Sequence, residues 1–307
     1  MTVELRSKDS QRQLVEGEFL FTEEDFARIA KMLHDDAGIY LPEVKATLVY
    51  SRLAKRLRAL GLQSFRDYCA LLTEEGGAKG GPVAGERQQM LAALTTNVTR
   101  FYREPHHFDH LKTRVLPPLL DHARRGGRVR LWSAACSTGP EPYSMALTVL
   151  SLMPEAAKFD VRILATDIDP NVVAEGRRGV YSADAVEPIP NDLRTRWMTR
   201  VSQDGELGWS AGDDMRKMIS FRELNLIGSW PMKGTFDVIF CRNVVIYFEE
   251  ETQARVWSRF KPLLTPEGRL YIGHSERLNG PAASAFVSDG LTTYRFADGA
   301  GAKGAES

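Results

Sequence analysis

Several features that would place a chain in a large class of proteins are scarce or absent. The sequence holds three cysteines, Cys69, Cys136 and Cys241, which lie far apart and form no pair with metal-binding spacing. No apolar run approaches the roughly 20 residues needed to span a bilayer, and the polar N-terminal segment lacks the apolar core of a signal peptide. These absences predict a soluble protein of the reducing cytoplasm.

Net charge is also lacking. The 40 lysines and arginines are balanced by 40 aspartates and glutamates, so no overall field attracts the chain to nucleic acid or to anionic lipid. Hydrophobic residues make up 43% of the chain and charged residues 26%, which are ordinary values for a globular protein. A length of 307 residues suits one large and one small domain.

The first part of the chain carries helical patterns and no strand pattern. Thr22 and Gly38 delimit a first helix, and Pro42 and Gly61 delimit a second. We expect a mobile arm before the first helix. Two further helices are predicted at 64–75 and 87–97, and a flexible Gly-rich loop at 76–86 separates them.

From residue 127 onward, apolar strands alternate with amphipathic helices. The predicted strands are 129–135, 161–169, 236–243 and 268–276, and the predicted helices between them are 140–153, 170–179 and 250–264. This alternation indicates a parallel sheet with helices on both faces, as in α/β folds. Two short strands follow around Asp289 and Gly290, and the turn signals Asp204-Gly205 and Ala211-Gly212 predict a small antiparallel insertion.

These patterns predict five segments. They are a helical domain at 20–94, a linker or lid at 95–126, an α/β domain at 127–296, an inserted β subdomain at 194–222 and a disordered tail at 297–307.

The turn after the first strand has the place of a cofactor loop but not the composition of a dinucleotide site. It has one glycine, Gly139, where the dinucleotide fingerprint has three. Pro140 and Pro142 remove amide donors from the helix start, and Glu141 adds a negative charge, so phosphate would bind poorly. The loop suits a cationic cofactor without phosphate, such as S-adenosylmethionine; an ordinary strand–helix turn is the alternative.

Polar residues also follow the second and third strands, at the sheet edge where ligands bind. Asp167 can accept both hydroxyls of a ribose, whereas Asp169 before Pro170 can cap the next helix; both aspartates could be caps. After the third strand, Arg242 and Asn243 can bind ligand oxygens. Tyr247 could project into the cleft or pack in the core.

Two further segments could have either a purely structural role or a specific functional one. The stretch "TTNVTRFYRE" at 95–104 could fold over the cofactor as a lid or serve as a polar linker. His106, His107 and His110 lie close in sequence, but His106 and His107 would point about 100° apart on a helix. We favour a packing or surface role for these histidines and expect no metal.

The second helix carries a basic stripe. Lys45, Arg52 and Arg56 are spaced i, i+7 and i+11, and Lys55 lies on the flank. The stripe could be a solvated face or a docking face for an acidic partner helix.

Taken in order, the motifs resemble one family. "LTTNVTRFYRE", "WSAACSTGPEPYSMA", "LATDID", "FDVIFCRNVVIYF" and "GHSE" are together similar to the CheR family of chemotaxis receptor methyltransferases, over about residues 20–296. The resemblance implies a Rossmann-like class I methyltransferase sheet, an all-helical N-terminal receptor-docking domain and an antiparallel β insertion. It implies S-adenosylmethionine as cofactor, S-adenosylhomocysteine as product and glutamate side chains of chemoreceptor signalling domains as substrate.

The resemblance also implies roles for individual residues. Arg103 and Tyr247 would face the methyl-transfer centre as catalytic residues. The cofactor contacts would be Asn97, Thr99 and Arg103 from the lid, Glu141 at the methionyl end, Asp167 at the ribose, Asn225 and Leu226 beside the adenine, and Arg242 and Asn243 on the far side.

The implied partners are the chemoreceptor helical bundle, met by Lys45, Arg52, Lys55 and Arg56, and a receptor C-terminal peptide held by the β insertion. We expect a monomer that binds no nucleic acid.

Three rival functions share parts of the pattern. The zero net charge and "CRNVVIYF" argue against a nucleic-acid methyltransferase, and the proline-flanked Gly139 argues against a dehydrogenase. A receptor-binding scaffold without activity would have lost cofactor contacts, and the predicted ones are present.

Overall fold

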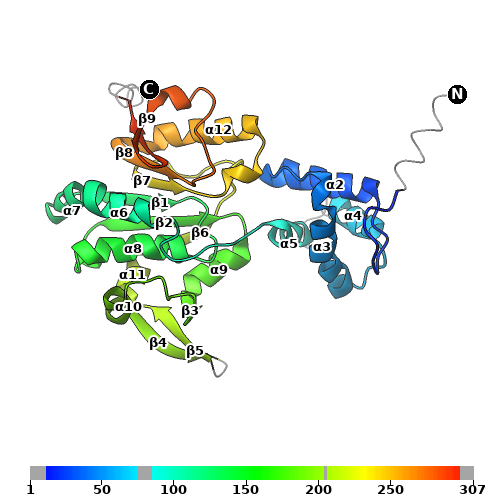
Figure 1. Ribbon diagram of the computed structural model, residues 1–307, viewed down its shortest axis with the longest axis horizontal. Coiled ribbons are helices and arrows are strands. Elements are labelled where there is room, and N and C mark those ends of the chain that lie inside the picture. Colours follow the sequence, from blue (N-terminus) through cyan, green and yellow to red (C-terminus); the bar gives the residue numbers. More distant parts are fainter. Residues whose placement is uncertain (1–11, 75–84, 204–205, 298–307) are drawn as a thin grey trace. The chain divides into compact units, whose positions relative to one another are not determined.

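The computed structural model describes residues 12–74, 85–203 and 206–297 (Figure 1). The chain divides into two compact units, and the first ends at Thr96 and the second begins at Asn97. Most of the predicted N-terminal arm, most of the loop at 76–86, the Asp204-Gly205 turn and nearly all of the tail lie outside the described residues. Among the described helices, none combines the length and the apolar character needed to cross a bilayer.

The first unit is helical, as predicted. Thr22 caps the first helix through a reciprocal pair of hydrogen bonds with Asp25, and Gly38 ends it in the left-handed conformation. The predicted second helix begins as a short 3-10 turn before the regular α-helix. The helices are α2 (Glu23–Ala37), the 3-10 turn Glu43–Lys45, α3 (Ala46–Leu60), α4 (Phe65–Glu74) and α5 (Glu86–Leu94).

Two arginines of the basic stripe have partners inside this unit. Arg56 pairs with the buried Glu86 through its guanidinium, with 3.0 Å between Nε and Oε1. Arg52 donates to the carbonyls at the end of α5, at 2.9 Å to Leu94 and 2.8 Å to Thr95. Because these contacts hold α5 against α3, the two arginines have a structural role in addition to any docking role. Lys45 and Lys55 are exposed.

The second unit contains a seven-stranded sheet in the order β6-β2-β1-β7-β8-β10-β9. The five strands from β6 to β8 run parallel, and β10 and β9 are antiparallel at one edge. The strands are β1 (Val129–Ser133), β2 (Val161–Asp167), β6 (Ile219–Glu223), β7 (Phe236–Cys241), β8 (Leu264–Ile272), β9 (Phe286–Gly290) and β10 (Thr293–Phe296). The predicted parallel sheet with its two terminal strands is confirmed.

A separate three-stranded antiparallel sheet forms the insertion, in the order β3-β5-β4. Its strands are β3 (Val180–Ser182), β4 (Met198–Gln203) and β5 (Glu206–Ala211). The structure therefore begins this sheet earlier than the predicted segment 194–222. It also gives 219–223 to the main sheet, where β6 pairs with β2 from Ile163↔Ile219 to Asp167↔Glu223. The local sequence pattern did not predict β6 as a strand of the main sheet, because this short segment is a strand through its pairing with the distant β2.

Helices cover both faces of the main sheet. Leu131 joins the apolar cluster formed with α7 and α8, whereas its neighbour Trp132 points to the other face and packs on Phe260 of α12, with ring centroids 5.2 Å apart. The helices are α6 (Pro105–His110), a π-helical turn (Leu111–Val115), α7 (Leu116–Arg124), α8 (Pro140–Leu152), α9 (Pro170–Arg178), α10 (Asn191–Trp197), α11 (Asp213–Met218) and α12 (Glu250–Phe260), with 3-10 turns at Ala156–Lys158, Val245–Tyr247, Lys261–Leu263 and Ala283–Ala285.

The predicted linker or lid at 95–126 is mostly structured. From Pro105 to Arg124 the chain is helical, and Phe108, Leu111 and Leu120 are buried in the core of the second unit. The sequence pattern of alternating strands and helices begins only at β1, and it did not reveal that these helices pack on the sheet. The loop 97–104 remains as the segment that can serve the site.

The order of strands places the site. The chain runs from β1 to β2 and β6 on one side and later to β7 and β8 on the other. The loops after β1 and β7 therefore diverge at the carboxyl edge of the sheet, which is where open α/β sheets bind ligands.

Gly139 at the start of α8 allows a close approach at this edge. Its φ is 99°, and a Cβ atom there would lie 2.7 Å from the Tyr181 hydroxyl and 3.0 Å from the Cα of Gly176. The hydroxyl is not free to move away, because it donates to the carbonyl of Thr138 at 2.8 Å.

We predict that Gly139→Ala lowers the free energy of unfolding by about 1–3 kcal/mol more than Gly126→Ala. Gly126 also has a positive φ, of 89°, but has open space where a Cβ would lie, so this control carries the backbone strain without the clash. Urea unfolding of both variants measures the difference. Equal losses would show that the packing around Gly139 is unimportant.

Candidate functional site

A buried guanidinium connects three segments at the carboxyl edge of the sheet. Arg242, directly after β7, has a side chain that is 1% exposed. Its Nη1 lies 2.9 Å from Oε2 of Glu141 at the start of α8, and its Nη2 lies 3.2 Å from Oε2 of Glu104 and donates to the carbonyl of Arg103. The loop 97–104, the β1–α8 turn and the end of β7 are thus held together by one side chain.

The two carboxylates respond differently to this environment. Burial would raise the pKa of Glu104, but Arg242, His274 and Asn243 outweigh that effect and lower this pKa to about 2. Burial raises the pKa of Glu141, although Arg242 and Ser133 act in the opposite direction.

Glu141, which was predicted to contact a cofactor directly, already has hydrogen-bond partners within the protein. One oxygen of Glu141 accepts from the hydroxyl of Ser133 at 2.7 Å, and the other accepts from Arg242. The sequence suggested an unopposed negative charge because Arg242 lies 101 residues away. With Glu104 included, two carboxylates face one guanidinium, so a surplus negative charge remains and suits a cationic ligand.

A second group of predicted residues meets beyond β2. Oδ2 of Asp167 accepts from the amide of Ser137 at 2.8 Å, and Oδ1 accepts from the amide of Asp169 at 3.2 Å. Asp169 caps α9, as one interpretation of the sequence predicted, and also accepts from the side chain of Asn97 at 3.0 Å. The carbonyl of Asn97 in turn accepts from the Ser137 hydroxyl at 2.9 Å. These contacts bring the lid residue Asn97 to Asp167.

Asp167 is suited to bind the hydroxyls of a ribose. Its side chain is 8% exposed, and burial raises its pKa. Backbone amides occupy part of its capacity, but each carboxylate oxygen has two lone pairs, so the carboxylate of Asp167 can still accept from a ligand hydroxyl.

Glu276 fixes the loop after β7 and was not predicted as a site residue. Its carboxylate accepts from four backbone amides, those of Gly273, Asn243, Val244 and Val245, at 2.6 to 3.0 Å. Burial raises the pKa of Glu276, and these amides oppose the increase. The motif "GHSE" contained Glu276, but the local sequence gave no sign that its carboxylate would reach the end of β7.

The remaining predicted residues lie on the same edge. The amide of Leu224 donates to the carbonyl of Asp167 at 2.9 Å, which places Asn225 beside β2, and Leu226 is buried. The side chain of Asn243 donates to Glu104 at 3.3 Å. Arg103 donates to the carbonyl of Val98 at 2.9 Å.

Thr99 and Tyr247 are both half-buried, on the lid and on the 3-10 turn after β7. The structure therefore joins Asn97 to the region of Asp167, Glu141 to Glu104 through Arg242, and Asn243 directly to Glu104.

Backbone strain is concentrated at the site. Glu104, Ser137 and Asn243 have positive φ values of 58°, 50° and 58°, and Tyr102 beside Arg103 has 51°. Residues other than glycine adopt this conformation at an energetic cost and do so mainly at functional sites. The carboxylate and amide contacts described above hold these residues in place.

The residues present fit S-adenosylmethionine. Buried carboxylates at Glu141 and Asp167 suit a positively charged ligand with a ribose, and Pro140 and Pro142 leave few amides for phosphate.

Two family models match the chain. Residues 97–294 match the model of the CheR methyltransferase SAM-binding domain, and residues 24–95 match the CheR methyltransferase all-alpha domain.

The chain belongs to the CheR methyltransferase family.

Similar proteins match over nearly their whole lengths. A probable chemotaxis protein methyltransferase of Rhizobium etli is 54% identical over 86% of this chain and 97% of that protein. A chemotaxis protein methyltransferase of Pseudomonas aeruginosa is 42% identical over 90% and 94% of the two chains, and one of Escherichia coli is 38% identical over 88% and 89%. The family predicted from the ordered motifs, its fold class and a domain that binds S-adenosylmethionine are confirmed.

The pKa of Glu104 gives a pH-dependent test. Its folded pKa, about 2, lies below the ordinary value of 4.5, so the ionised form stabilises the fold above about pH 4.5, and this contribution is lost as the pH falls toward 2. We predict that Glu104→Gln lowers the free energy of unfolding by about 1–3 kcal/mol at neutral pH. The penalty should shrink between about pH 5 and about pH 3.

Denaturant unfolding across this pH range measures the effect, with the exposed Glu267→Gln as control. A penalty that is the same at both ends of the range would show that Glu104 is not held ionised by Arg242.

Proposed function

We propose that this chain transfers the methyl group of S-adenosylmethionine to glutamate side chains on the cytoplasmic signalling domain of chemoreceptors. The products are glutamate methyl esters and S-adenosylhomocysteine, and the reaction serves adaptation in chemotaxis. Membership of the family and the names of the chemotaxis relatives support this function.

The proposed methyl transfer requires few catalytic groups from the protein. S-adenosylmethionine supplies a methyl group on a positively charged sulfur. A glutamate has an unperturbed pKa of about 4.3, so it is ionised at neutral pH and needs no general base. Since an anionic oxygen attacks a cationic centre, charge is neutralised as the new O–C bond forms and the C–S bond breaks. The chain has to align the two reactants and exclude water, and we propose that it needs no metal ion for this step.

Arg103 is the residue that we propose to orient the substrate carboxylate. The observation that supports this role most directly is the hydrogen bond from Arg242 to the carbonyl of Arg103, because it fixes the backbone of Arg103 at the carboxyl edge of the sheet. Tyr247 would donate a directional hydrogen bond from the turn after β7.

Transfer of label from S-adenosylmethionine to a receptor cytoplasmic fragment tests the function. A methyl ester of glutamate is hydrolysed by alkali, so the label should appear on the fragment and leave as methanol in base. Label that resists alkali would contradict esterification of carboxylates. Failure to label any receptor fragment, with the cofactor bound, would favour a scaffold without activity.

We predict that Arg103→Ala and Tyr247→Phe each lower kcat by about 10- to 100-fold at saturating substrate, because the substrate carboxylate is then poorly aligned. Arg100→Ala, an exposed change in the same loop, should leave kcat close to that of the unaltered protein. Initial rates of methanol-releasable label measure the effect. Unchanged turnover in both variants would remove Arg103 and Tyr247 from the catalytic assignment.

For the receptor bundle, we propose docking on the basic helix and specifically on its two lysines. Lys45 and Lys55 are exposed, and a positive surface accelerates association with an acidic helical partner. Arg52 and Arg56 also hold α5, so their loss would change stability together with binding. The β3-β5-β4 insertion is the surface that we propose for a receptor C-terminal peptide.

We predict that Lys45→Glu combined with Lys55→Glu slows association with the receptor fragment by about 10-fold or more at low salt, and that added salt reduces the difference. The control combines Lys158→Glu and Lys261→Glu, which make the same charge change on exposed lysines of the second unit. Stopped-flow or surface binding measures the rates. Equal rates in the two double variants would exclude docking through this helix.

A further inference from the structure

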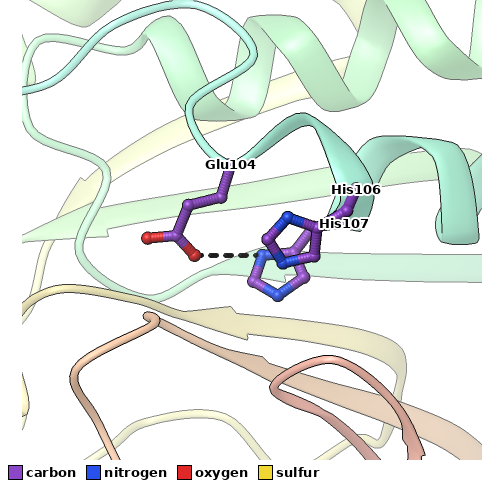
Figure 2. A group of neighbouring side chains, drawn as sticks. All are labelled: Glu104, His106 and His107. Atoms are coloured by element: carbon purple, nitrogen blue, oxygen red, sulfur yellow. Dashed lines mark ion pairs between the residues drawn. The ribbon is translucent and has the colours of Figure 1, made fainter.

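Three buried polar atoms that form no hydrogen bond lie near the start of α6, and one of them is in an ion pair with Arg242 at 3.2 Å. They are Oε2 of Glu104, Nε2 of His106 and Nδ1 of His107. These three residues can each offer one ligand atom such that the atoms lie within 4.8 Å of one another. Figure 2 shows both imidazoles and the carboxylate directed toward a common region beside the helix. The two imidazole nitrogens have no hydrogen-bond partner, and burying such lone pairs is costly, so this arrangement needs an explanation.

The hydrogen bonds of His107 indicate which of its nitrogens carries the proton. Nε2 lies 3.2 Å from the carbonyl oxygen of Leu291 and 2.8 Å from the hydroxyl of Thr292. A carbonyl oxygen can only accept, so Nε2 is the protonated nitrogen and Nδ1 carries a lone pair. That lone pair faces Oε2 of Glu104 at 3.5 Å. Two acceptors at this distance repel each other unless a cation lies between them.

His107 is fully buried, and its Nε2 is occupied by the backbone carbonyl of Leu291. A neutral imidazole with its second nitrogen bound to a backbone carbonyl is the form in which histidine binds metals, because the outer hydrogen bond fixes the ring and its tautomer.

The turn into α6 brings the third group to the same place. Glu104 precedes Pro105 in a left-handed conformation, with φ of 58°, and this folds its side chain back beside the histidines. Its other oxygen is fixed by His274 at 3.0 Å and by Asn243 at 3.3 Å. The rings of His106 and His107 have centroids 4.2 Å apart, although their positions on a helix suggested that they would diverge.

We propose that Glu104, His106 and His107 form a binding site for one divalent transition-metal ion of the Zn²⁺ type. Two imidazoles and a carboxylate are a ligand set that Zn²⁺ accepts, with a fourth position left for water. Metal–ligand bonds of about 2.0–2.1 Å in a tetrahedron separate two ligand atoms by about 3.4 Å. The separation of 3.5 Å between Nδ1 of His107 and Oε2 of Glu104 agrees with this value.

The proposed ion is separate from the methyl-transfer step. Arg242 lies 3.2 Å from Oε2 of Glu104, and its positive charge opposes the binding of a second cation. With three protein ligands and this repulsion, we expect a weaker site than a structural zinc site with four ligands. A carboxylate oxygen with two lone pairs can meet both a metal and Arg242.

The test measures metal binding directly on the full chain without an affinity tag. Calorimetric titration with Zn²⁺ should give one ion per chain, and Zn²⁺ should raise the melting temperature because it binds only the folded state. His106→Ala should lose both effects, whereas His122→Ala, a change at an exposed histidine in the same unit, should keep them.

A second variant gives a spectroscopic signature and does not depend on the loss of binding. His106→Cys places a thiolate ligand at the site, so Co²⁺ should produce a thiolate-to-cobalt charge-transfer band. The unaltered protein should not show the band, since Cys69, Cys136 and Cys241 are buried. His122→Cys should not show it either, because residue 122 is not part of the ligand group formed by Glu104, His106 and His107. Absence of a bound ion in the unaltered protein, undiminished binding by folded His106→Ala, or a His106→Cys spectrum without the band would each overturn the proposal.

Discussion

The carboxyl edge of the sheet depends on the buried guanidinium of Arg242. Glu141, Glu104 and the carbonyl of Arg103 all meet this one side chain, although they belong to three separate segments of the chain. Two carboxylates that faced each other without Arg242 would repel at close range in a poorly hydrated site. With Arg242 between them, the lid, the start of α8 and the end of β7 become one unit that retains a surplus negative charge. That charge suits a cationic cofactor.

Rigidity at this edge comes from carboxylates that bind backbone amides. Glu276 accepts four amides around the turn after β7, and Asp167 accepts two around the turns after β1 and β2. These contacts hold Ser137 and Asn243 in left-handed conformations that would relax in isolation. A methyl transfer that needs alignment more than acid or base catalysis benefits from such a preformed frame.

Local patterns predicted those features whose physical cause is local. The cap at Thr22, the end at Gly38 and the apolar strand at 236–241 depend on neighbouring residues, and the structure contains all of them. The pattern missed β6 and the helices between Pro105 and Arg124, because their burial depends on a sheet that forms from distant segments. It also assigned Arg52 and Arg56 only to a solvated or docking face, since Glu86 lies 30 positions from Arg56 and Thr95 at the end of α5 lies 43 positions from Arg52.

The sequence by itself determined the class of fold, the family and the kind of cofactor. Strand–helix alternation and five ordered motifs are properties of the linear chain, and the prolines beside Gly139 disfavour phosphate wherever the loop lies. Only the tertiary structure decided which charges are paired and which polar atoms are left without partners. Electrostatic energy depends on distance through space and on burial. For that reason Glu141 could be recognised in the sequence, but its pairing with Arg242, and the meeting of Glu104 with His106 and His107, could not.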